Sequence, residues 1–131
     1  MQAIHAAVGP RRLIVVLVNG GSLSPDWVKA NCPTVVEALE GGQSGGTALA
    51  EILAGDISPS GVLPYTMYPT EFLSQAPHQD MSMRSGVGRT YRFYTGEPLW
   101  PFGHSLSYTT WQVGRVYHTK MQACETTSSP W

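Results

Sequence analysis

The turn at residues 42–46 holds a serine in surroundings that suggest nucleophilic catalysis. Its sequence, Gly-Gln-Ser-Gly-Gly, fits the pattern G-x-S-x-G with Ser44 at the centre. In serine hydrolases this turn joins a strand to a helix, exposes the hydroxyl and lets the helix N-terminus stabilise an oxyanion. A carboxylate and a general base would come from four candidates, namely Asp56, Asp80, His78 and His104. The alternative is structural, because glycines before a helix also let a loop lie against a neighbour.

The same glycine-rich turn could hold a phosphate at a helix N-terminus, but its sequence lacks the motifs that do so. It contains neither Gly-Lys-Ser/Thr nor G-x-G-x-x-G. The four histidines, at positions 5, 78, 104 and 118, are too widely spaced to form a metal motif. The one close pair, His78 and Asp80, is more typical of surface hydrogen bonding. We therefore predict no metal site and no cofactor.

Aromatic and charged side chains of the second half suggest a different chemistry, that of sugar binding. Sugar rings stack on aromatic faces, while charged side chains bind their hydroxyls. The aromatic set is Tyr91, Phe93, Tyr94, Trp100, Phe102 and Tyr108. The spacing alone favours another interpretation, in which these rings form the core of a β-layer. The nearby Asp80, Arg84, Arg89 and Arg92 are predicted to form ion pairs that hold loops in place.

The composition excludes several classes of protein. The 131 residues are 42% hydrophobic and 13% charged, with a net charge of −1. This length allows one domain, and the absence of a basic excess argues against nucleic-acid or anionic membrane partners. The longest apolar run, 13–18, is far shorter than the roughly 20 residues of a membrane span. The two cysteines, Cys32 and Cys124, belong to no CxxC pair, which argues against a zinc ribbon or a disulfide-rich scaffold.

The first half of the chain has the pattern of an α/β layer. The β-branched run 13–18 predicts a strand that is buried on both faces, and 34–39 predicts a second strand. Helices are expected near 24–30 and over 47–54, with Gly55 ending the latter. This alternation predicts two adjacent parallel strands joined by a crossover helix.

The second half is irregular by comparison. Between residues 67 and 88 the chain has prolines and polar residues without a period. Residues 89–94 alternate polar and aromatic side chains, which predicts a strand, and 106–117 predict the start of a separate β element. The tail beyond residue 118 has no pattern and is expected to be disordered.

Short motifs follow one another along most of the chain. They include the run 42–50 (GQSGGTALA), Gly-Asp at 55–56, Pro-Ser-Gly at 59–61 and Leu-Pro at 63–64. The later ones are Tyr-Pro at 68–69, DMSMR at 80–84, GRTYRFYTG at 88–96, Pro-Phe-Gly at 101–103 and LSYT at 106–109. In this order the motifs resemble the C-terminal α/β-sandwich domain of glycoside hydrolase family 3. The second set is especially similar to the β-xylosidase/α-L-arabinofuranosidase branch.

The resemblance implies a fold, a division of the chain and an activity. Residues 1–108 would form part of a three-layer α/β sandwich with a mostly parallel sheet, and residues 109–131 the start of a fibronectin-III-like element and a disordered tail. The resemblance implies that full-length members are secreted enzymes with an additional barrel domain. It also implies that they hydrolyse β-linked xylosides by a retaining mechanism without a cofactor. No position of this sequence matches either catalytic motif, so no catalytic residue can be assigned.

The resemblance also carries expectations about the chain by itself. We expect residues 1–131 to lack glycosidase activity, and to aggregate or to form a loose state because much of the sheet is missing. The alternatives are a non-catalytic carbohydrate-binding or scaffold remnant and the serine hydrolase with Ser44.

The sequence departs from the family pattern at three positions in particular: Gly41 stands for a usual Pro, Val62 for Arg and Ser105 for Gly.

Overall fold

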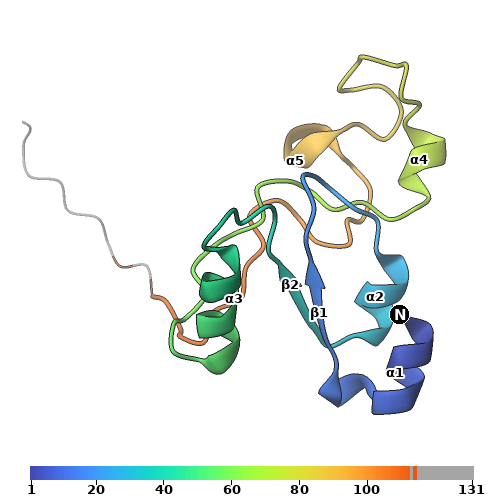
Figure 1. Ribbon diagram of the computed structural model, residues 1–131. Coiled ribbons are helices and arrows are strands. Elements are labelled where there is room, and N and C mark those ends of the chain that lie inside the picture. The colour runs from blue at the N-terminus through green and yellow to red at the C-terminus, as the bar shows by residue number, and fades with distance from the viewer. Residues whose placement is uncertain (113, 115–131) are drawn as a thin grey trace, which may run out of the picture.

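The chain alternates helices and strands up to residue 54 and is mostly irregular thereafter (Figure 1). A computed structural model describes residues 1–112 and 114. The elements are α1 (Gln2–Val8), the 3₁₀ turn η1 (Pro10–Arg12), β1 (Ile14–Leu17), α2 (Asp26–Asn31), β2 (Thr34–Glu37), α3 (Gly45–Ala54), α4 (Phe72–Gln75) and α5 (Thr90–Phe93). Among the described residues this gives a mixed α/β arrangement with a small sheet and several short helices.

The two strands pair in parallel, as the sequence predicts. Ile14 lies opposite Thr34 and Leu17 opposite Glu37, so the register runs without a bulge over four residues in each strand. Helix α2 forms the crossover between them, which parallel neighbours require. The carboxyl ends of β1 and β2 therefore meet at one edge of the sheet, where ligands bind in open α/β sheets.

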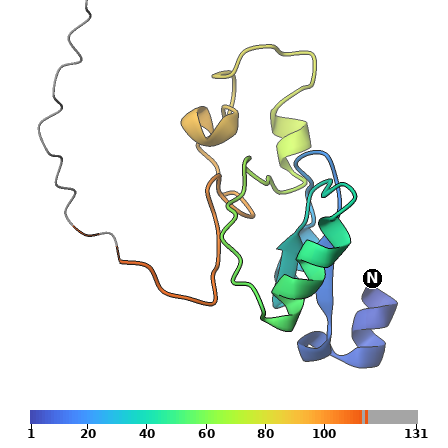
Figure 2. The ribbon, with the colours of Figure 1, turned by 60° about the vertical axis from the view of Figure 1, so that its left-hand side comes forward.

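The helices lie on opposite sides of the strand pair in the view of Figure 1, with α3 to its left and α1 and α2 to its right. The turned view of Figure 2 brings α3 in front of the strands. Helices α1 and α2 are joined by His5, whose ring meets the Trp27 ring edge-on at 5.3 Å and whose Nε2 lies 3.2 Å from the carbonyl oxygen of Asn31. Helix α3 ends at Gly55 in the left-handed conformation (φ 86°), which confirms the predicted C-cap.

The second half is tied to the first by a ladder of backbone contacts around Met67. The Met67 N–H donates to the Trp100 carbonyl at 2.9 Å, and the Leu99 N–H donates to the Met67 carbonyl at 2.8 Å. The hydroxyl of Ser22, in the loop after β1, donates to the Thr66 carbonyl at 2.9 Å. Segment 65–67 is thus held between the edge of the sheet and segment 99–100, and Thr66 and Met67 are both buried.

The prediction of a strand at residues 89–94 is wrong, because this segment contains the one-turn helix α5. Thr90 takes a positive φ of 63°, which turns the chain out of the extended conformation, and its N–H donates to the Tyr68 hydroxyl at 2.7 Å. An aromatic alternation makes a strand only where a partner strand is available, and here segment 99–100 pairs with Met67 instead.

Residues 106–112 contain no strand either, and the rest of the predicted β element, with the tail, lies outside the described residues. Ser105, where the resemblance implies a glycine, does not have a positive φ; among the described residues, the non-glycine residues that do are Leu39 and Thr90.

The prediction that the first strand is buried on both faces is also wrong for this structure. Val15 is 3% exposed, but its neighbour Ile14, on the other face, is 49% exposed. A strand is covered on both faces only where other layers pack against each of them. The two-stranded sheet has a hydrogen-bonding edge on each strand and an apolar face that the described residues cover incompletely.

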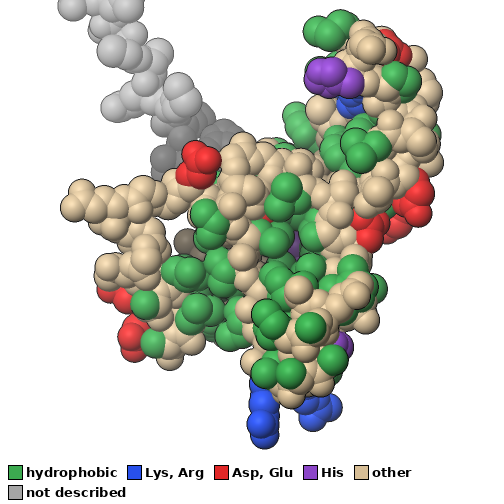
Figure 3. Space-filling model, turned by 45° about the vertical axis from the view of Figure 1, so that its right-hand side comes forward, with side chains coloured by type: hydrophobic (Ala, Val, Ile, Leu, Met, Phe, Trp, Pro, Cys, Tyr) green, Lys and Arg blue, Asp and Glu red, His purple; other side chains and the backbone are tan. Residues whose placement is uncertain are grey.

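We predict that the chain self-associates and binds the dye ANS, because apolar side chains stand exposed on several elements. They include Ile4 and Val8 of α1, Val18 after β1 and Leu53 of α3. Figure 3 shows hydrophobic side chains spread over the face it draws, with few charged ones between them. Exposed apolar patches and open strand edges promote association. Light scattering and ANS fluorescence measure both effects, and a monomer that binds no ANS would contradict the prediction.

Candidate functional site

Ser44 lies at the start of α3 without the partners of a nucleophile. It is exposed and occupies the N-cap position, and its side chain makes no capping hydrogen bond. Among the described residues, no hydrogen bond joins it to a histidine, and His78 and Asp56 are exposed elsewhere on the surface. A nucleophile needs a base in hydrogen-bond reach. The geometry therefore favours the structural interpretation of the G-x-S-x-G turn.

The structure offers no metal centre within residues 1–112 and 114, since no three His, Cys, Asp or Glu side chains gather there. Over the same residues, no helix is both long and apolar enough to span a bilayer.

The charged group of the second half is held by contacts other than the predicted ion pairs. Asp80 accepts from the Ser82 N–H at 2.9 Å, and its pKa is lowered mainly by a hydrogen bond from Ser85. The Arg89 guanidinium donates to the Pro77 carbonyl. The remaining arginines lie over the Phe93 ring, Arg84 at 4.8 Å and Arg92 at 5.5 Å. These groups do hold the loop between α4 and α5.

The aromatic set does not form one layer, because its rings take part in separate clusters. Tyr91 stacks on Phe102 at 4.5 Å between ring centroids. Tyr94 instead meets Tyr68 and Phe72 edge-on, at 5.0 and 5.5 Å. The other members lie apart: Trp100 lies beneath the ammonium of Lys29, Phe93 beneath two arginines, and Tyr108 donates its hydroxyl to the Ile52 carbonyl.

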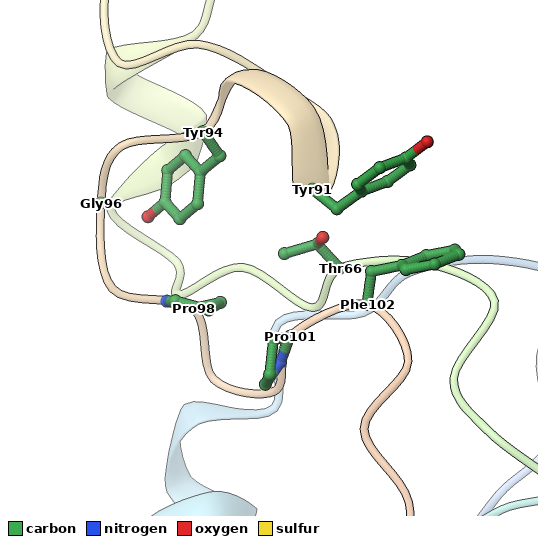
Figure 4. A pocket seen from close by; sticks show the side chains of 7 residues that line it. All are labelled: Thr66, Tyr91, Tyr94, Gly96, Pro98, Pro101 and Phe102. Atoms are coloured by element: carbon green, nitrogen blue, oxygen red, sulfur yellow. The ribbon is translucent and has the colours of Figure 1, made fainter. Parts of the chain in front are cut away.

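Tyr91 and Phe102 line a cavity of about 240 Å³ beneath α5 (Figure 4). Its other lining residues are Thr66, Tyr94, Gly96, Pro98 and Pro101. The figure shows the Thr66 side chain between the rings of Tyr94 and Tyr91. The cavity thus combines aromatic and proline surfaces with three hydroxyls, and none of its lining side chains carries a charge.

A second group of polar residues, which no sequence motif predicts, meets at the carboxyl ends of the strands. Asn19 follows β1 and Glu37 ends β2, while Tyr65 arrives from the second half of the chain. The Asn19 amide donates to the Tyr65 hydroxyl at 3.4 Å, and the Leu39 N–H donates to Glu37 at 3.3 Å. Asn19 Oδ1 and Glu37 Oε2 are buried without a partner among the described residues. The signal in the sequence was a polar residue at or just after the end of each strand, since parallel strands bring such residues together.

Burial raises the pKa of Glu37 above the usual glutamate range, against the lowering effect of hydrogen bonds from Leu39 and Tyr65. The pKa of the Tyr65 hydroxyl is raised as well, first by burial and then by the charge of Glu37. The sheet edge therefore holds a carboxylate that its surroundings disfavour in the charged form.

We predict that Glu37→Gln stabilises the chain at neutral pH. The raised pKa means that the folded state binds a proton more readily than the unfolded state, so stability is greatest below the unfolded-state pKa, about 4.3, and falls as the pH rises through the folded-state value. The neutral variant lacks this fall, and its melting temperature should exceed that of the parent at pH 7. Thermal unfolding between pH 3.5 and 8 measures the difference, which should vanish at the acid end. An equal difference at every pH would contradict this explanation.

The comparisons with known proteins agree with one another. Residues 1–108 match the family described as Glycosyl hydrolase family 3 C-terminal domain. The chain is 40% identical over 116 residues to the probable exo-1,4-beta-xylosidase xlnD of Aspergillus clavatus, and 42% identical over 112 residues to Beta-D-xylosidase 1 of Arabidopsis thaliana. These matches cover 84% and 81% of this chain and 14% of each relative.

A solved structure gives the same result in three dimensions. It is described as a GH3 exo-beta-xylosidase (XlnD) in complex with a xylobiose aziridine activity-based probe, and it matches with a TM-score of 0.70 at 39% identity. The match covers 75% of this chain and 14% of that one, so the chain spans about 14% of the length of the proteins it matches. The predicted resemblance is confirmed: the chain belongs to the glycosyl hydrolase family 3 C-terminal domain family.

Proposed function

We propose that this chain serves as the C-terminal α/β part of a β-xylosidase-type glycoside hydrolase. The observation that carries the proposal is the match to the exo-beta-xylosidase structure, whose likeness in fold comes with 39% sequence identity. The relatives from Aspergillus clavatus and Arabidopsis thaliana, both named as xylosidases, support the same substrate class. The reaction would be hydrolysis of O-glycosyl bonds in β-linked xylosides by a retaining mechanism.

Within such an enzyme the chain would have a supporting role rather than supply the reacting groups. Retaining hydrolysis uses two carboxyl groups roughly 5 Å apart, one as nucleophile and one as acid and base. The lining of the Tyr91 cavity contains no carboxyl group. Glu37 is half-buried at the sheet edge and accepts a backbone hydrogen bond. We propose that the strand pair belongs to a larger, mostly parallel sheet in a three-layer sandwich, and that the enzyme is extracellular, as its family resemblance implies.

A chimera tests the proposal directly. The segment of the Aspergillus clavatus enzyme that matches this chain would be replaced by the corresponding residues of this sequence. We expect the chimera to hydrolyse an aryl β-xyloside in preference to an aryl β-glucoside or an aryl ester. A folded chimera that hydrolyses none of them, or the ester alone, would contradict the proposal.

We predict that the purified chain of 131 residues does not turn over an aryl β-xyloside by itself. The physical reason is that retaining chemistry requires two carboxyl groups roughly 5 Å apart, and no residue of this sequence matches the motif of either one. A colorimetric assay with the unmodified Aspergillus enzyme as positive control measures this. Turnover that disappears when Glu37 or another carboxylate of the chain is replaced would refute the prediction.

A further inference from the structure

We infer that the cavity lined by Tyr91 and Phe102 binds one neutral pyranose ring, and that Thr66 hydrogen-bonds a sugar hydroxyl there. The first observation is the stacked pair itself. The Tyr91 side chain is 68% exposed and Phe102 is exposed beside it, although both are large apolar groups that folding normally covers. An open aromatic face next to a cavity suits the C–H face of a sugar ring.

The second observation is independent and concerns Thr66. Its side chain lines the cavity and the residue is only 5% exposed, yet its hydroxyl oxygen has no hydrogen-bond partner among the described residues. A buried hydroxyl without a partner is unfavourable. Its oxygen exposes less than 1 Å² of surface, so a ligand hydroxyl bonds to it once the Thr66 side chain rotates toward the cavity, and that bond removes the penalty. The backbone beside this hydroxyl is anchored on both sides, by the hydrogen bond from the Ser22 hydroxyl to the Thr66 carbonyl and by the Met67–Trp100 bridge.

The lining also indicates the class of ligand. Its polar side-chain groups are the hydroxyls of Thr66, Tyr91 and Tyr94, and the rest is aromatic, proline or glycine surface. The neighbouring arginines contact Phe93, outside the cavity lining. A charged ligand would find no countercharge, whereas a ring with hydroxyl edges and an apolar face fits both kinds of surface. The volume of about 240 Å³ lies just below the usual range for small-molecule sites, about 300–1,000 Å³, and so suits a single ring.

This inference rests on the proposed function for the choice of xylose as the ring. The test is saturation-transfer NMR on the full chain with methyl β-D-xylopyranoside, and with xylitol as the matched ligand that has hydroxyls but no ring face. This measurement works at low protein concentration and tolerates self-association. We expect saturation of the ring protons of the xyloside and none of xylitol.

Two variants and one control assign the signal to the cavity. Tyr91→Ala should abolish the saturation signal. Thr66→Val should weaken binding roughly tenfold, as the loss of one hydrogen bond implies. Its melting temperature should stay equal to that of the parent or rise, because an unpartnered hydroxyl is removed. Trp111→Ala removes an exposed aromatic ring outside the cavity lining and should leave the signal unchanged.

The inference is overturned by the absence of saturation, by equal saturation of xylitol, or by binding that survives both Tyr91→Ala and Thr66→Val. A loss of binding and of melting temperature together in Thr66→Val would also overturn it, since that pattern marks a structural role. The chimera assay reads hydrolysis and this experiment reads binding by the cavity, so either idea can fail while the other stands.

Discussion

Replacing Gly88 with alanine is expected to unfold the loop between α4 and α5 and to remove the aromatic cavity with it. Gly88 is buried, has a φ of 74°, and a Cβ built there would overlap the carbonyl oxygen of Phe93. A left-handed conformation costs an L-residue about 1–2 kcal/mol, and the overlap adds a backbone displacement to that cost. We expect a loss of at least about 3 kcal/mol in the free energy of unfolding.

The measurement is urea unfolding at a fixed low protein concentration, with hydrogen–deuterium exchange of residues 83–95 as the local readout. The hydrogen bonds that close this loop, Arg89 N–H to Met83 and Thr95 N–H to Val87, should exchange fastest in the variant. Gly103→Ala is the matched control, since Gly103 has a similar φ of 78° but an added Cβ meets nothing within 4 Å. It should lose only about 1–2 kcal/mol. Equal losses at both positions would show that the overlap with Phe93 is harmless.

Met67→Ala is the second substitution with a large expected effect. Met67 is 2% exposed and has the most completely buried large side chain among the described residues. Its backbone joins segment 65–67 to segment 99–100, so the side chain fills the junction between the two halves of the chain. Truncating a buried methionine leaves a cavity and costs about 2–5 kcal/mol.

Met81→Ala serves as the control, because Met81 is 87% exposed and its truncation should change stability by less than about 0.5 kcal/mol. Thermal unfolding of both variants compares the same chemical change in two surroundings. If the two variants melt alike, the junction around Met67 does not contribute to the stability of the chain in solution.

The sequence predicts the first half of the fold well because its signals there are local. The apolar runs at 13–18 and 34–39 and the C-cap at Gly55 all correspond to elements of the structure, with ends shifted by a few residues. The signals fail in the second half, where single residues decide the conformation. Thr90 reverses the expected strand through one positive φ, which no propensity of threonine suggests.

The candidate sites depend on contacts between distant segments, and these are harder to predict. Tyr91 and Phe102 do come from the predicted aromatic set, and their cavity keeps the sugar-binding interpretation of that set open. No local pattern in the sequence marks Thr66 or Tyr65, because their environment is made by the loop after β1 and by segment 99–102. Only the prediction that the two strands pair in parallel could have suggested that Asn19 and Glu37 lie close together.

The burial of Cys32 makes local opening of the crossover measurable as a chemical rate. The residue follows α2 directly, its N–H donates to the Val28 carbonyl at 2.8 Å, and its side chain is shielded from solvent. In a variant with Cys124 replaced by serine, Cys32 is the sole thiol of the chain. A thiol reagent can then react only during excursions that expose this position, so the labelling rate reports how often the crossover opens around Cys32 under native conditions.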